Sequence, residues 1–213
     1  MPARHARLTE ASDELAAALA AIRAELGLTA EFPPEAEAEA AALAADPPLP
    51  EPDQTGVAFV TIDPEGSTDL DQALHLESDG DGVVVRYAIA DVPAFVAPGG
   101  AIDVEARRRG QTMYAPDGRV PLHPPVVSEG IASLLAGQVR GAYVWTMRLD
   151  ARGDVVATTL ERARVRSREQ LTYAEAQRRS DDGDAMLGLL REVGELRIAL
   201  EAERGGASLD MPE

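Results

Sequence analysis

Apolar positions follow two different spacings along the chain, and the change falls near residue 54. Before it, leucine and isoleucine recur every three or four residues, at Leu15, Leu19, Ile22 and Leu26. This spacing predicts an amphipathic helix over 8–26. An Ala/Glu-rich stretch predicts a second helix over 35–46, and the prolines between 47 and 52 predict a stiff linker. We therefore expect residues 1–53 to form a helical N-terminal module.

From residue 54 to 213 the pattern is that of a mixed domain. Short runs rich in β-branched residues predict strands at 57–62, 83–90, 143–149 and 155–165. Acidic and glycine-rich turn signals join them in hairpins at 79–82 and 150–154. Helical spacing predicts helices at 101–109, 128–135 and 185–204, and Thr172 with Glu175 forms a capping-box pattern that opens another. The predicted fold class is α+β, with helices on a mixed or antiparallel sheet.

Composition narrows the functional classes. The sequence has no apolar run of transmembrane length and no apolar segment after its first arginines, so neither a membrane partner nor a secretory signal is expected. Its lack of cysteine excludes disulfide partners and thiolate chemistry. The expected location is cytoplasmic. A net charge of −17 repels phosphate backbones, so contact with nucleic acid would depend on local groups of arginine.

The strongest chemical signal is a run of carboxylates, Asp63, Asp69 and Asp71, that follows the predicted strand at 57–62. Asp69 and Asp71 are two residues apart and face one side of an extended chain. A bend at Pro64–Gly66 can bring Asp63 back toward them. Clustered carboxylates raise one another's pKa, and a hard divalent cation removes that repulsion. The three acids alone fit a Mg²⁺ site, with Mn²⁺ as an alternative, and a solvated acidic loop equally well.

Four blocks place these acids in a wider pattern over about 57–213. They are FVTIDPEGSTDLDQALHL, YAIADVPAFVAPGGAIDVEARRRGQTMYAPDGRVPLHPPVVSEGIASLL, ARVRSREQLTYAEAQ and RGGASLDMPE. In content and order they resemble the catalytic (RNB) domain of the ribonuclease II/ribonuclease R family. The resemblance implies a processive, Mg²⁺-dependent 3′→5′ exoribonuclease that hydrolyses single-stranded RNA to nucleoside monophosphates.

The resemblance also assigns roles by position. Asp63, Asp69 and Asp71 match three of the four clustered catalytic aspartates of the family, and the fourth falls at Gln72. A carboxamide offers a cation an oxygen but no charge, so we expect a weaker site built from the three aspartates and Gln72. Asp91, in the block YAIADV, is expected either to play a structural part or to orient the loop.

Candidate RNA contacts come from tyrosine and arginine. Tyr114 and Tyr173 match family tyrosines that pack against RNA bases, and stacking suits a nuclease without sequence preference. Arg164, Arg166 and Arg168 alternate, so on a strand they would line one face. That face is either a track for phosphates or a solvated edge, and the sequence leaves both interpretations open.

The family's domain continues past the last block, and no OB-fold pattern flanks it here. We therefore expect the N-terminal half of a short-form enzyme, with a C-terminal half of the same domain as a partner if the protein is split or truncated. Gln72 motivates an alternative, a catalytically inactive RNA-binding or regulatory fragment. A metal-dependent phosphohydrolase of small substrates is a third hypothesis, which the tyrosines and arginines disfavour.

Overall fold

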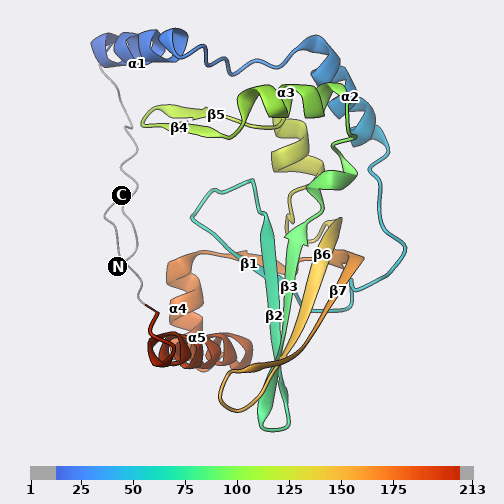
Figure 1. Cartoon of the computed structure of the whole chain (residues 1–213), viewed down its shortest axis with the longest axis vertical. Helices are drawn as coiled ribbons and strands as arrows, with labels where there is room; N and C mark the ends of the chain where they lie inside the picture. The colour runs from blue at the N-terminus through green and yellow to red at the C-terminus, as the bar shows by residue number, and fades with distance from the viewer. Residues whose placement is uncertain (1–12, 207–213) are drawn as a thin grey trace. The chain divides into compact units, whose positions relative to one another are not determined.

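The computed structural model describes residues 13–206, which divide into two compact units (Figure 1). Of the described residues, 13–46 and 96–126 belong to the first unit, and 47–95 and 127–206 belong to the second. The segment 47–53, which the sequence assigns to the N-terminal module with its proline-rich linker, is thus part of the second unit. The predicted boundary between 53 and 54 stays a prediction. In the part of the chain described, no helix is long and apolar enough to cross a membrane.

Within its described residues, the first unit contains three helices and a hairpin. These are α1 (Asp13–Glu25), α2 (Pro34–Ala45), α3 (Ala101–Arg109), β4 (Met113–Ala115) and β5 (Gly118–Val120). The helices predicted at 35–46 and 101–109 are confirmed, and residues 8–12 of the first predicted helix lie outside the described residues. Helix α3 is held at both ends. Glu39 of α2 accepts the backbone N–H of Ala101 at 2.6 Å, and the Arg109 guanidinium lies 3.8 Å from the centre of the Phe32 ring.

The second unit is built on a six-stranded sheet with the order β7-β6-β3-β2-β1-β8. Its strands are β1 (Val60–Ile62), β2 (Gln72–Asp79), β3 (Gly82–Ala90), β6 (Val139–Leu149), β7 (Val155–Arg166) and β8 (Glu169–Leu171). Neighbouring strands are antiparallel except β1 and β8, which are parallel. Helices α4 (Tyr173–Asp181) and α5 (Ala185–Glu203) follow β8. This mixed sheet with helices confirms the predicted α+β class.

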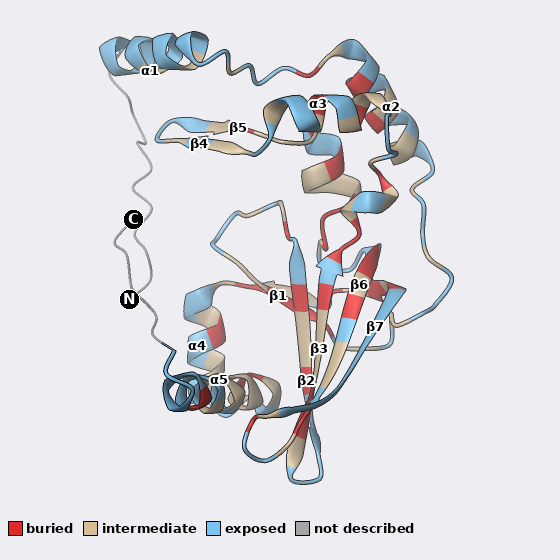
Figure 2. Ribbon diagram, viewed as in Figure 1, coloured by how far each residue is buried: buried red, intermediate tan, exposed pale blue. Residues whose placement is uncertain are grey.

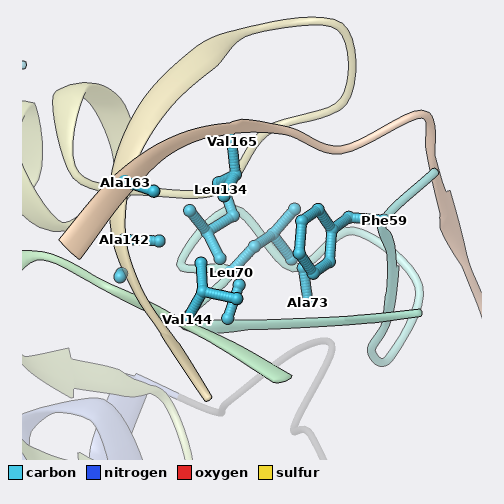
Figure 3. Packing of buried hydrophobic residues seen from close by; sticks show 10 residues of the cluster. Phe59, Leu70, Ala73, Leu134, Ala142, Val144, Ala163 and Val165 are labelled. Atoms are coloured by element: carbon cyan, nitrogen blue, oxygen red, sulfur yellow. The ribbon is translucent and has the colours of Figure 1, made fainter. Parts of the chain in front are cut away.

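Side chains that alternate in direction along the strands form two apolar layers, one on each face of the sheet. On one face, small side chains of the central strands pack against residues of the connecting segments (Figure 3): Phe59, Leu70, Ala73, Ala88, Leu134, Ala142, Val144, Ala163 and Val165. On the other face, residues of β2 and β3 pack against α5: Leu74, Leu76, Val83, Val85, Met186, Leu189, Leu190 and Val193. The sheet is therefore covered by α5 near the β2–β3 hairpin, whereas the first half of β7 is exposed (Figure 2).

Several elements differ from the sequence prediction. The strand predicted from Val57 begins only at Val60. The helix predicted at 128–135 is instead a π-helical turn over Val126–Ile131. A 3-10 turn that was not predicted (Val92–Ala94) follows β3. Strand β2 was not predicted, because its alanine, leucines and glutamate have little preference for strands. Its eight residues form a strand because each pairs with β3, from Gln72 opposite Ile89 to Asp79 opposite Gly82.

Replacing Leu70 by alanine tests how far the fold depends on this core. Leu70 is fully buried, and Figure 3 shows it among Leu134 and Val144. We expect Leu70→Ala to lower the free energy of unfolding by about 2–5 kcal/mol in urea titrations, because a cavity remains. The control Leu160→Ala removes a side chain that is 51% exposed, and it should change stability by about 0.5 kcal/mol. Equal losses in both variants would contradict this view of the core.

Candidate active site

The loop that carries the three aspartates is held in place by hydrogen bonds of its backbone. After β1, the backbone N–H of Asp63 donates to the carbonyl of Leu171 in β8 at 3.0 Å. A turn follows in which Ser67 N–H donates to Pro64 O at 3.2 Å, and Gly66 takes a φ of 80° that favours glycine. The predicted bend at Pro64–Gly66 is therefore present.

Ser133 fixes the second part of the loop. Its hydroxyl accepts the N–H of Leu70 at 2.9 Å and donates to the carbonyl of Thr68 at 2.7 Å. The carbonyl of Leu70 accepts the N–H of Leu134 at 2.9 Å, and that of Asp71 accepts the N–H of Ala90 at 2.9 Å. With Leu70 buried in the core, its two neighbours in sequence are directed to the other side of the chain.

The three aspartates line one cavity of about 290 Å³ in the second unit. The other lining residues are Ile62, Gln72, Leu74, Tyr87 and Tyr173. The lining residues as a whole come from β1, β2, β3, the first turn of α4 and the loop, and Ile62 and Tyr173 are 111 residues apart in the chain. The structure thus brings together the predicted Asp63, Asp69, Asp71, Gln72 and Tyr173.

Crowding of the carboxylates changes their acidity. The pKa of Asp63 is raised above its ordinary value by partial burial and then by the charges of Asp69 and Asp71. The pKa of Asp71 is raised by partial burial and by Asp69. Tyr87 has a raised pKa as well, because it is partly buried and lies near Asp63. Without a cation, the site therefore disfavours its own negative charge.

The carboxylates that line the cavity are side chains of the type that binds a divalent cation. The donors are oxygens, and the Oδ2 atom of Asp63 is buried without a hydrogen-bond partner in the described structure. Between residues 13 and 206, however, no group of three or more His, Asp or Glu side chains is already gathered closely enough to hold a metal ion. Binding of a cation would require the carboxylates to converge, which a shared cavity allows.

Gln72 and Tyr87 form a pair at the edge of this cavity. The Tyr87 hydroxyl donates to the Oε1 atom of Gln72. Sequence reasoning did not single out Tyr87, although it lies in the block YAIADV. Because strands β2 and β3 are antiparallel, with Leu74 opposite Tyr87 and Gln72 opposite Ile89, Gln72 and Tyr87 are diagonal neighbours on one face. Only this register reveals the pair.

The two predicted tyrosines lie in different units. Tyr173 opens α4, is 59% exposed and lines the acidic cavity. Its helix begins with Thr172 Oγ1 accepting the N–H of Glu175 at 3.1 Å, as the capping-box pattern predicts. Tyr114 lies in the first unit, on β4, and is 75% exposed. There it lines a separate cavity of about 460 Å³ together with residues of α1. A contact of either tyrosine with RNA stays a prediction.

Two of the three predicted arginines bind another part of the chain. Arg164 donates to the carboxylate of Asp53 at 3.3 Å and to a nearby carbonyl, and Arg168 donates to the carbonyls of Thr55 and Gly56 at 3.2 and 3.3 Å. Backbone hydrogen bonds of 2.8 Å on both sides of Arg164 also attach this segment to β7. Arg166 has a buried Nε without a hydrogen-bond partner among the described groups. Arg164 and Arg168 thus hold the segment 51–56, and the role of the three arginines toward RNA stays a prediction.

Asp91 ends β3 as a fully buried carboxylate. Arg162 of β7 donates from Nε to its Oδ2 at 2.5 Å. Gly141 packs so closely that a Cβ there would lie 3.1 Å from Pro50 and 3.4 Å from that oxygen. The pair fixes the end of β3, where the preceding N–H, that of Ala90, binds the Asp71 carbonyl. Asp91 thus lies outside the cavity, next to the residue that binds the backbone of the acidic loop, and its role in orienting that loop stays a prediction.

Known proteins share this sequence pattern. Residues 52–212 match the RNB domain family. The sequence is 38% identical to a probable exosome complex exonuclease RRP44 of Caenorhabditis elegans over 166 residues, which is 75% of this chain and 17% of that protein. It is 36% identical to exoribonuclease 2 of Psychromonas ingrahamii over 110 residues, 52% of this chain and 17% of that protein. The chain thus spans about a sixth of the length of these relatives. Residues 207–213 of the last block, RGGASLDMPE, lie outside the described residues.

Solved structures share the fold. RNase R of Mycoplasma genitalium, in complex with ribose methylated single-stranded RNA, superposes with a TM-score of 0.80 at 25% identity, covering 90% of this chain and 32% of that one. Yeast Ssd1, described as a pseudonuclease, superposes with a TM-score of 0.60 at 18% identity, covering 70% and 20%. Since a pseudonuclease has this fold too, activity must be argued from the site.

The raised pKa values predict that removing one carboxylate stabilises the metal-free protein. A carboxyl group whose pKa is higher in the folded state contributes stability below its unfolded pKa of about 3.9, and this contribution is lost as the pH rises through the folded pKa. In EDTA, Asp63→Asn and Asp71→Asn should therefore melt at higher temperature than the unsubstituted protein near pH 8. The gain should shrink as the pH falls toward 4.

Glu65→Gln is the matched control for this experiment. Glu65 is an exposed acid of the same loop that does not line the cavity. Its substitution should leave the melting temperature nearly unchanged at each pH. A lower melting temperature for both asparagine variants near pH 8 would show that the carboxylates are not electrostatically strained.

Proposed function

This chain belongs to the RNB domain family of exoribonucleases, and on that premise we propose that it carries the metal-binding part of a 3′→5′ exoribonuclease. The proposed reaction is hydrolysis of single-stranded RNA to nucleoside monophosphates, with Mg²⁺ or Mn²⁺ as cofactor. The observation that carries the proposal is that Asp63, Asp69 and Asp71 line one cavity, together with the exposed Tyr173.

The proposal gives each side chain a task. Asp63, Asp69 and Asp71 hold the cation, and their mutual repulsion explains why a cation is favoured there. A bound Mg²⁺ supplies positive charge at the scissile phosphate and a nucleophilic water. The buried Leu70 and its hydrogen bond to Ser133 keep Asp69 and Asp71 directed into the cavity, from where they can move toward a bound cation.

Support for the RNA substrate comes from relatives and from the cavity wall. RNase R of Mycoplasma genitalium is known in complexes with ribose methylated single-stranded RNA and with double-stranded RNA. In this chain Tyr173 presents an exposed ring at the cavity, where a base of a single strand can stack. The direction of cleavage and the mononucleotide product follow from the family resemblance.

Cation binding and RNA digestion test the proposal together. We expect the chain to bind Mn²⁺, detected by electron paramagnetic resonance, and Asp71→Asn to weaken that binding. A protein carrying this chain within a full-length RNB domain should release nucleoside monophosphates from 5′-labelled single-stranded RNA in Mg²⁺. Asp71→Asn should slow release at least about a hundredfold, because charge stabilisation by a metal contributes several kcal/mol.

Glu65→Gln again serves as the matched control and should retain both properties. Full activity of the Asp71→Asn protein would refute the assigned role of that residue. Cation and RNA binding without any mononucleotide release would favour the alternative, an inactive RNA-binding or regulatory protein, which the carboxamide at position 72 motivates.

The stacking role of Tyr173 can be tested separately. Because one base stacked on an aromatic ring contributes about 1–3 kcal/mol, Tyr173→Ala should weaken binding of a single-stranded RNA oligonucleotide by roughly 5- to 150-fold. Tyr173→Phe keeps the ring and should restore most of the affinity. Fluorescence anisotropy in EDTA measures both variants without cleavage. Equal affinities for the alanine and phenylalanine variants would exclude stacking.

A further inference from the structure

The position where the family has its fourth aspartate holds a pair of residues, Gln72 and Tyr87. The Tyr87 hydroxyl donates to Gln72 Oε1, and both side chains line the cavity of the three aspartates. Tyr87 is fixed by its place in β3, where it lies opposite Leu74 on one side and Trp145 on the other. The hydrogen bond therefore sets the direction of the Gln72 carboxamide.

This direction has a chemical consequence. In a planar carboxamide the oxygen and the NH₂ group diverge, and the oxygen accepts hydrogen bonds while the NH₂ group donates two. The oxygen of Gln72 is engaged by the phenol of Tyr87, so the NH₂ group is the part of the carboxamide that can bind a further acceptor. Gln72 is exposed at the cavity edge, so its N–H groups remain available to a ligand.

We propose that Tyr87 holds Gln72 as a hydrogen-bond donor to a phosphate oxygen of the RNA, so that Gln72 binds the substrate and not the metal ion. Tyr87 is then a positioning residue, which acts through the carboxamide. This inference rests on the proposed function, because it takes RNA as the ligand of the cavity. It changes one part of the sequence-based expectation, in which Gln72 was a ligand of the cation.

Electrostatics favour this division of tasks. Asp63, Asp69 and Asp71 already place three formal negative charges around the cavity, and a phosphodiester that enters it is itself negative. A fourth carboxylate would repel that phosphate, whereas a neutral N–H donor attracts it. Hydrogen bonds that involve a charged partner are about twice as strong as neutral ones. Compared with a fourth aspartate, the Gln72–Tyr87 pair thus lowers the affinity of the site for the cation and raises its affinity for the RNA backbone.

Three substitutions separate the donor role from the ligand role. Gln72→Glu keeps the oxygen that Tyr87 binds but replaces the donor by a charged oxygen. Gln72→Ala removes both groups, and Tyr87→Phe removes only the hydroxyl. Each variant is measured for Mn²⁺ binding by electron paramagnetic resonance and for binding of a single-stranded RNA oligonucleotide by anisotropy in EDTA. Circular dichroism melts check that each variant is folded.

If Gln72 is a donor, Gln72→Ala and Tyr87→Phe should leave Mn²⁺ affinity within about twofold and weaken RNA binding roughly tenfold, as expected for a lost hydrogen bond to a charged group. Gln72→Glu should bind Mn²⁺ more tightly and RNA at least as weakly as Gln72→Ala. A purely structural role of Tyr87 would lower both affinities together, and this result would overturn the inference.

Other outcomes also decide the matter. A tenfold loss of Mn²⁺ affinity in Gln72→Ala with unchanged RNA binding would make Gln72 a ligand of the cation and overturn the proposal. Unchanged RNA binding in Tyr87→Phe would remove the positioning role. If the unsubstituted protein bound no Mn²⁺, the metal-dependent function would fail, and the donor role would still be decided by the RNA affinities in EDTA.

Discussion

The acidic site depends on the burial of one side chain, Leu70, between two aspartates. Leu70 is fully buried in the layer formed by Phe59, Leu134 and Val144. Since neighbouring residues of an extended chain point to opposite sides, burying Leu70 directs the flanking carboxylates to the cavity. The hydrophobic effect thus positions charges that would otherwise separate, and the hydroxyl of Ser133 satisfies the backbone of the same short segment.

This arrangement works against the stability of the metal-free protein. The pKa of Asp63 and that of Asp71 are raised by partial burial and by neighbouring charge, so each ionised carboxylate destabilises the folded state. Contacts elsewhere in the second unit offset this loss of stability. The buried Asp91 with Arg162 fixes the end of β3, and through Ala90 that strand end holds the backbone of Asp71. The sheet therefore supports a loop whose own charges disfavour the folded state.

The edge of the sheet shows how one residue pattern can serve two purposes. Arginines that alternate along β7 suggest a track for phosphates, yet Arg164 and Arg168 hold the segment 51–56 through its carbonyls and through Asp53. A segment that covers an edge strand in this way also protects it from pairing with other chains. Hydrogen bonds within the chain thus engage guanidinium groups that, from the sequence alone, could all bind phosphates.

The sequence by itself determined the fold class, the hairpins at 79–82 and 150–154 and most helices, because local spacing and turn residues encode these features. The resemblance of its sequence blocks to a known family gave the family and the aspartates at positions 63, 69 and 71. Strand β2 and the diagonal pairing of Gln72 with Tyr87 required the tertiary structure, since they depend on the register between β2 and β3. The partners of Leu70, Ser133 and Arg164 also lie more than 60 residues away in the chain. Contacts at such separations leave no local periodicity, so only the folded chain reveals what holds the site.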